Sequence, residues 1–194
     1  MMQQALSIKQ VASICGVSSD RVKRWTGKLR LKTCLSMENT TVVLRHDLID
    51  FLVQHNMPIP ESLIPFAAKK ILFVLSKEVL DDVYMQFVML FFEKLRAEAN
   101  CIIDHVSYGA EAKMKIMVYK PAVIILDVTG PGEDSLSILQ LIRKTEEFCS
   151  IKVIALLKKD VQASAEEQIS ELGVEAIMPR SIELRSLIEK IHSF

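Results

Sequence analysis

From position 69 to the end of the chain, short apolar runs alternate with longer segments of mixed polarity, and no other feature constrains the fold as strongly. The runs at 123–126 (VIIL) and 153–157 (VIALL) are apolar at every position, which is typical of strands in a parallel sheet buried on both faces. We predict five strands, each followed by a helix: strands at 71–75, 101–106, 122–127, 151–157 and 174–178, and helices at about 79–99, 109–118, 135–145, 161–172 and 182–192. This pattern predicts an α/β domain with a five-stranded, doubly wound parallel sheet over residues 69–194.

A proline-rich segment separates this region from a smaller N-terminal part. Pro58, Pro60 and Pro65 fall within eight residues, and each one fixes its own φ and keeps the preceding residue out of the helical region. We therefore interpret residues 57–68 as a linker. The charge also changes across it, because residues 1–60 carry a net charge of +4 whereas residues 69–194 carry −3.

The composition excludes several classes of protein. Half of the 194 residues are apolar, which is enough to form a core and argues against a disordered chain. The four cysteines form no C-x-x-C motif, so we interpret them as reduced thiols rather than as zinc ligands. The N-terminus lacks a signal-peptide core, and the most apolar window, 84–92, is shorter than a membrane span. We expect a soluble cytoplasmic protein without metal, cofactor or membrane partner.

The N-terminal part carries the signals of two short helices and a turn. Ser7 and Gln10 fit a capping box at the start of the first helix, and Gly16 suits its end. A second helix is expected from Ser19 to Trp25, with Ser18 as its N-cap. Two such helices joined by a glycine-containing turn predict a helix-turn-helix. After it we expect a two-stranded wing, at 29–34 and 40–44, and a third helix at 47–55.

This run resembles the winged helix-turn-helix of excisionases and of mercury-resistance-type regulators. The resemblance covers about the first 56 residues and implies a DNA-binding domain over residues 1–56. The residues that carry it follow the order of the family pattern: Ala12, Gly16-Val17-Ser18, Val22, Trp25, Gly27, Leu29 and Asp47-Leu48.

The second helix offers a basic face for DNA. Its cations fall away from the face that carries Val22 and Trp25, and such a helix places its N-terminal residues against base edges and its Lys and Arg residues against phosphates. Asp20 on the same helix opposes this interpretation, and a solvated basic face without a partner is the alternative. We expect DNA contacts from Ser19, Arg21, Lys23, Arg24, Lys28, Arg30 and Lys32.

In the C-terminal region, Asp127 ends the third expected strand, and chemistry in doubly wound folds occurs at the carboxyl ends of strands. The stretch 121–144 resembles a response-regulator receiver domain, in which this aspartate accepts a phosphoryl group. The resemblance covers about residues 69–194 and implies a flavodoxin-like fold.

The sequence departs from the receiver pattern at the positions that support the chemistry. Leu75 and Ser76 replace an acidic pair that holds Mg²⁺, Leu157 replaces a hydroxyl residue, and Arg180-Ser181 replaces Lys-Pro. Phosphoryl transfer to an aspartate needs a metal ion to neutralise charge. We therefore expect a pseudo-receiver in which Asp127 is not phosphorylated and is either a relic or the partner of Arg180 or Lys158 in a structural salt bridge. The alternative is a phosphorylatable site that uses the displaced acids Glu78, Asp81 and Asp82.

The segment 84–92 is apolar nearly all round, so we expect it to contact a second copy, the winged helix, or, alternatively, only its own loops. We also predict a homodimer held by residues 69–194, in which the helices at 161–172 and 182–192 offer Ile169, Leu172, Leu187 and Ile191.

Together these patterns predict a non-enzymatic DNA-binding regulator whose partners are DNA, a second copy and a regulatory protein. The alternatives are a phosphorylatable response regulator of a two-component system and a scaffold whose winged helix binds protein instead of DNA.

Overall fold

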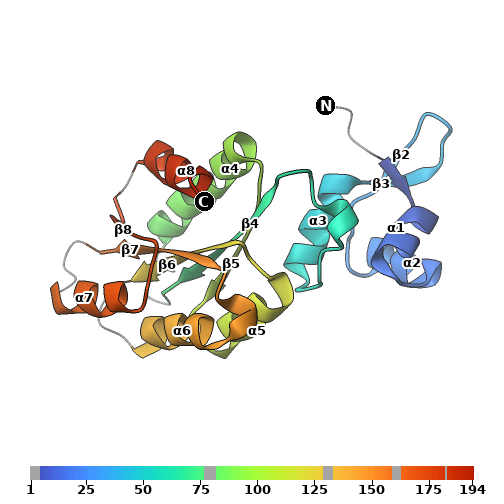
Figure 1. Ribbon diagram of the computed structural model, residues 1–194. Helices are drawn as coiled ribbons and strands as arrows, with labels where there is room; N and C mark the ends of the chain where they lie inside the picture. Colours follow the sequence, from blue (N-terminus) through green and yellow to red (C-terminus); the bar gives the residue numbers. More distant parts are fainter. Residues whose placement is uncertain (1–4, 77–81, 129–132, 159–162, 182) are drawn as a thin grey trace. The chain divides into compact units, whose positions relative to one another are not determined.

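The structure is a computed structural model that describes residues 5–76, 82–128, 133–158, 163–181 and 183–194. The chain divides into two compact units, Met1–Phe66 and Ala67–Phe194 (Figure 1). No helix in the described ranges is both long enough and apolar enough to cross a membrane.

Two short helices begin the first unit. Helix α1 (Ile8–Cys15) carries the predicted capping box of Ser7 and Gln10, and Gly16 ends the helix in the left-handed conformation at φ 63°. Helix α2 (Ser19–Gly27) begins at Ser18, whose Oγ accepts a hydrogen bond from the backbone N–H of Arg21 at 3.2 Å. Both caps satisfy N–H groups that have no partner within their helix.

A small antiparallel sheet follows the helices, in the order β1-β3-β2. Its strands are β1 (Ala5–Ser7), β2 (Cys34–Leu35) and β3 (Thr41–Leu44), and helix α3 (Arg45–Gln54) follows β3. Strand β1 was not expected, and the predicted strand at 29–34 was wrong over most of its length. The physical reason lies at Leu31, whose backbone N–H donates to Trp25 O at 2.9 Å instead of joining a ladder, next to Arg30 at φ 59°.

The proline-rich segment differs from the expected linker of residues 57–68. It contains a 3₁₀ helix, η1 (Glu61–Leu63), and Leu63 is buried. The Arg45 side chain donates hydrogen bonds to two carbonyls of this segment, from Nε to Leu63 O at 3.0 Å and from Nη2 to Ser62 O at 2.6 Å. The segment therefore packs as part of the first unit up to Phe66.

The second unit is an α/β fold with a five-stranded parallel sheet, as predicted, in the order β5-β4-β6-β7-β8. The strands are β4 (Lys69–Leu75), β5 (Cys101–Ser107), β6 (Val123–Val128), β7 (Lys152–Leu157) and β8 (Ala176–Pro179). The helices are α4 (Asp82–Ala99), α5 (Ala110–Tyr119), α6 (Glu133–Lys144), α7 (Ala163–Glu171) and α8 (Leu184–His192), with a 3₁₀ helix η3 (Glu146–Phe148).

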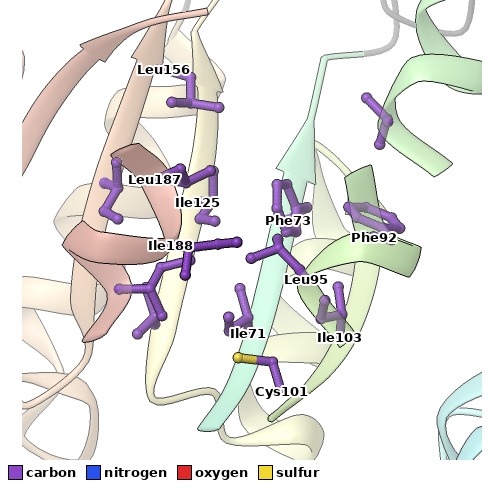
Figure 2. Packing of buried hydrophobic residues seen from close by; sticks show 14 of the residues in the cluster. Ile71, Phe73, Phe92, Leu95, Cys101, Ile103, Ile125, Leu156, Leu187 and Ile188 are labelled. Carbon is purple, nitrogen blue, oxygen red and sulfur yellow. The ribbon is translucent and has the colours of Figure 1, made fainter. Parts of the chain in front are cut away.

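Helices α4 and α8 cover one face of this sheet, and α5 and α6 cover the other (Figure 1). On the α4 and α8 side, alternate residues of β4 point into a common core, where Phe73 meets Phe92 of α4 with ring centroids 4.6 Å apart. Figure 2 shows this cluster, to which α8 adds Leu187 and Ile188. The side chains of the strands are buried on both faces of the sheet, and this burial fixes the strands in the centre of the unit.

This packing corrects the expected pairing surface. Ile169, Leu187 and Ile191 are buried within their own unit, and Leu172 is half-buried, so these residues do not form an exposed apolar face. On α4, Val88, Phe92 and Leu95 are buried whereas Met89 and Leu90 are exposed. The side chains of residues 84–87 lie outside the described part of the chain.

Candidate functional site

The carboxyl edge of the parallel sheet brings the predicted receiver positions together. Asp127 lies opposite Leu156 in the register of β6 and β7, one residue before the end of β6. Ser76 follows β4, Leu157 ends β7 and Arg180 follows β8. The backbone N–H of Arg180 donates to Leu157 O at 2.8 Å, and this hydrogen bond holds the backbone of Arg180 against the neighbouring strand.

Asp127 forms a two-point contact with Arg180. The Nη2 group of Arg180 donates a hydrogen bond to Asp127 Oδ2 at 2.9 Å, and Nε lies 2.9 Å from Oδ1. The side chains are 2% and 18% exposed for Asp127 and Arg180, respectively. Of the two cations that the sequence offered as partners, Arg180 and Lys158, the structure pairs Arg180 with the carboxylate. Because β7 lies between β6 and β8, this pair spans three strands.

The surroundings of Asp127 shift the pKa of its carboxyl group in two opposite directions. Burial raises the pKa of the Asp127 carboxyl above its ordinary value, and the Arg180 guanidinium and the Ser76 backbone N–H pull that pKa back without cancelling the rise. The carboxylate therefore depends on Arg180 for compensation of its charge in a site that excludes water.

Tyr108 is part of the site and was missed in the sequence. Its hydroxyl donates a hydrogen bond to the carbonyl oxygen of Asp127 at 2.8 Å, and its backbone N–H donates to Leu75 O at 3.1 Å. The residue is buried and follows β5, so it ties the ends of three strands together. A sequence signal existed, because Tyr108 stands directly before Gly109 at the carboxyl end of an apolar run.

The described residues of this edge do not fit a Mg²⁺ ion, which prefers carboxylate oxygens in octahedral geometry. Leu75 is buried and apolar, Ser76 offers a hydroxyl, and a cation already contacts Asp127. Over the part of the chain that is described, no three His, Cys, Asp or Glu side chains are grouped to hold a metal. The displaced acids, Glu78, Asp81 and the Asp82 side chain, lie outside the described residues. Leu157 is half-buried and Ser181 is exposed.

The second candidate surface is the basic face of α2. Val22 and Trp25 are buried, and Trp25 packs against Phe51 of α3 with ring centroids 5.3 Å apart, so the tryptophan is a core residue. Ser19 is half-buried beside the cap. The cations that were predicted to contact DNA are all exposed: Arg21, Lys23, Arg24, Lys28, Arg30 and Lys32.

Two of these cations form ion pairs with nearby carboxylates. Lys23 Nζ lies 3.4 Å from Asp20 Oδ1 on the same helix, and Lys32 Nζ lies 3.9 Å from Asp47 Oδ1. Exposed pairs of this kind contribute little to stability, but they reduce the positive field that Lys23 and Lys32 present.

Comparisons with known proteins give no match to a protein-family model or to a curated protein sequence. Solved structures do match, over about two thirds of the chain. A response regulator from Chloroflexus aurantiacus is 20% identical with a TM-score of 0.53, covering 65% of this chain and 96% of its own. A receiver domain of a DNA-binding response regulator from Colwellia psychrerythraea is 23% identical with a TM-score of 0.52, covering 64% and 96%.

A third similar structure is the receiver domain of a sensor histidine kinase from Pseudomonas aeruginosa, with a magnesium ion in its active-site cleft. It is 20% identical with a TM-score of 0.53 and covers 66% of this chain and 97% of its own. Over about two thirds of its length, this chain therefore has the fold of response-regulator receiver domains.

Proposed function

We propose that this chain is a non-enzymatic, DNA-binding regulatory protein. Its first unit is a winged helix-turn-helix that binds DNA through α2, and its receiver-fold unit makes protein contacts without being phosphorylated. One observation carries the DNA assignment: α2 buries Val22 and Trp25 and exposes Arg21, Lys23 and Arg24. A helix anchored by its apolar face and free to present cations is suited to a DNA groove.

The cations on this surface are expected to contribute unequally to DNA affinity. Lys23 is paired with Asp20 on the same helix, so Arg21 and Arg24 are expected to contribute more to DNA affinity. Arg21 lies in the first turn of α2 and is positioned for base edges, together with Ser19. Arg24 and the exposed Lys28, Arg30 and Lys32 are suited to phosphates.

Replacing Arg21 and Arg24 with alanine is expected to weaken DNA binding about tenfold or more at moderate salt. Each lost phosphate contact should also flatten the slope of log K against log salt by about 0.9. The measurement is a salt series by fluorescence anisotropy, on a duplex selected by the wild-type protein from a random-sequence pool. The matched control is Lys113→Ala/Lys144→Ala, which removes two exposed cations from the other unit.

Each outcome of this experiment decides between the proposals. A control that loses as much affinity as the α2 variant would show that net charge, and not the helix, carries the binding. A wild-type protein that selects no DNA even at low salt would favour the scaffold in which the winged helix binds protein. Two half-sites spaced by one helical turn in the selected sequences would support a homodimer.

The receiver-fold unit also has an exposed apolar surface that supports a role in protein contacts. Met114, Met117 and Val118 are spaced by three and four positions on α5 and all are exposed, although a surface helix normally places polar residues there. The opposite side of α5 is buried through Ala112, Ile116 and Tyr119. We propose this stripe of α5 as a contact surface for a second copy or a regulatory protein.

The second part of the proposal predicts that neither Mg²⁺ nor beryllofluoride binds at Asp127. The Arg180 guanidinium contacts both carboxylate oxygens, and Leu75 and Ser76 supply no further carboxylate. Titration of the full chain with Mg²⁺ and beryllofluoride, followed by fluorine and amide NMR, is expected to give no change that depends on Asp127. A bound fluoride signal that disappears in Asp127→Asn would instead establish a phosphorylatable response regulator.

A further inference from the structure

Helix α5 presents a continuous apolar stripe to solvent. Met114, Met117 and Val118 form this stripe, and their side chains are 61%, 58% and 41% exposed, respectively. Residues spaced by three and four positions lie next to one another on one face of a helix, so the three side chains make a single surface. A contiguous exposed apolar surface marks an interaction site, whereas single scattered apolar residues do not.

The stripe is the best developed apolar surface of the receiver-fold unit. Among the described residues of this unit, the other exposed large apolar side chains are Met89 and Leu90 of α4. These two are adjacent in the chain and diverge by about 100° round the helix axis, so they do not form a stripe. The surface of α7 and α8 that was predicted to pair is covered within its own unit.

The charges around the stripe suit a second copy of the same surface. Helix α5 and its C-cap carry four charged side chains: Glu111, Lys113, Lys115 and Lys120. Lys115 pairs with Asp104, and Lys120 Nζ lies 2.7 Å from Glu147 Oε1. Counted together with these two partners, three lysines and three carboxylates sum to zero. Such a surface does not repel its own copy, and it has no net field that would attract a strongly charged partner.

We infer that the receiver-fold units of two copies pair through α5, with the two helices antiparallel about a twofold axis. A twofold axis places the same residues on both sides of a contact, so the stripe packs against itself. The antiparallel direction follows from the helix dipoles, whose like ends would lie together in a parallel pair. Met114 of each copy then contacts Met117 and Val118 of the other. This inference rests on the proposed role of the unit in protein contacts and names the partner.

The size of the stripe sets the expected strength of the dimer. A standard stable interface buries about 800 Å² on each partner, and three side chains that are already partly covered supply only a fraction of that area. The two methionines are unbranched and adapt to an irregular contact. We therefore expect a reversible dimer with a dissociation constant of roughly 1–100 µM, and not an obligate one.

Sedimentation velocity of the full chain without DNA tests the pairing. Across about 1–200 µM, the wild-type mass is expected to rise from one chain to two. Met114→Ala/Met117→Ala should raise the dissociation constant at least tenfold, because buried apolar area is lost from both copies. The variant should fold normally, since both side chains are exposed and alanine favours the helix. The matched control is Met89→Ala/Leu90→Ala, which removes exposed apolar side chains from α4 and should leave the constant unchanged.

Two charged variants test which residues face each other. Met114→Lys and Met117→Glu should each be monomeric alone, because an unpaired charge in an apolar contact loses its hydration. Mixed in equal amounts, the two proteins should form a dimer again. In the antiparallel pair, the introduced cation of one copy lies against the introduced carboxylate of the other.

Every outcome decides the inference. A wild-type protein that stays monomeric across this concentration range would overturn it and leave the stripe to a regulatory protein. A dimer that survives Met114→Ala/Met117→Ala, or that the α4 control also loses, would place the contact elsewhere. A mixture of the charged variants that stays monomeric would overturn the antiparallel pairing. Because the masses are measured without DNA, a wild-type protein that selects no duplex would overturn the proposed DNA binding while the dimer stands.

Discussion

Replacing Arg180 with alanine is expected to lower the free energy of unfolding of the receiver-fold unit by about 3–5 kcal/mol at neutral pH. The variant leaves the Asp127 carboxylate, 2% exposed, without the cation that contacts both of its oxygens. Urea unfolding followed by tyrosine fluorescence measures this unit selectively, because all three tyrosines belong to it whereas the single tryptophan belongs to the first unit.

The pH dependence of this loss tests its cause. Burial already raises the pKa of Asp127 in the folded protein, and removal of Arg180 should raise that pKa further. A carboxyl with a raised folded pKa binds its proton more tightly when folded, so its contribution to stability falls as pH rises from the unfolded value, about 4, through the folded value. The difference between Arg180→Ala and the wild type should therefore be small near pH 4 and grow as the pH rises toward 7.

The matched control is Arg180→Ala/Asp127→Asn, in which the orphan charge is removed together with its partner. This double variant is expected to recover most of the lost stability, because a neutral amide is cheaper to bury than an unpaired carboxylate. A loss that is equal at both pH values, or that the second substitution does not relieve, would show that Arg180 acts through packing and not through the charge of Asp127.

The parallel sheet could be predicted from the sequence because its strands carry an unmistakable signal. A strand buried on both faces is apolar at every position, as in the runs at 123–126 and 153–157. Strand β1 and the hairpin strands lack this signal, since they are short and expose one or more of their residues. A strand was expected at 29–34, but the backbone N–H of Leu31 donates to Trp25 O instead of joining the sheet.

The residues at the edge of the sheet could be placed because the ends of apolar runs mark the ends of strands. The choice between Arg180 and Lys158 as the partner of Asp127 could not be made in the same way, because it depends on how far the Arg180 side chain reaches across β7. The same limit hid the buried ion pair between Lys115 of α5 and Asp104 of β5. Sequence spacing shows on which face of its helix or strand a residue lies, but it does not show which residue of another element that side chain contacts.

The predicted pairing surface failed for a related reason. The spacing of Leu187 and Ile191 correctly marks the apolar face of α8, but it does not say what covers that face. In the structure the sheet covers it, within the same unit. On α5, by contrast, both sides are apolar, and only the structure shows that Met114 and Met117 are the exposed side.

Replacing Phe51 with alanine is expected to unfold the first unit in a large fraction of molecules and to abolish DNA binding, although Phe51 does not belong to the basic face. Phe51 is buried, and its ring lies 5.3 Å from that of Trp25 and 4.5 Å from that of His55. Loss of a buried phenylalanine costs about 3–5 kcal/mol. A unit of 66 residues has a small core and a total stability of similar size.

The single tryptophan of the chain makes this result measurable without a label, because Trp25 packs on Phe51 and reports only on the first unit. In Phe51→Ala, Trp25 emission should shift to longer wavelength while the tyrosine-monitored unfolding of the second unit stays unchanged. Phe66→Ala removes the same atoms from an exposed position and should alter neither signal. If Trp25 emission shifts and Phe51→Ala nevertheless keeps wild-type DNA affinity, DNA binds while the first unit is unfolded, and the DNA surface must lie elsewhere.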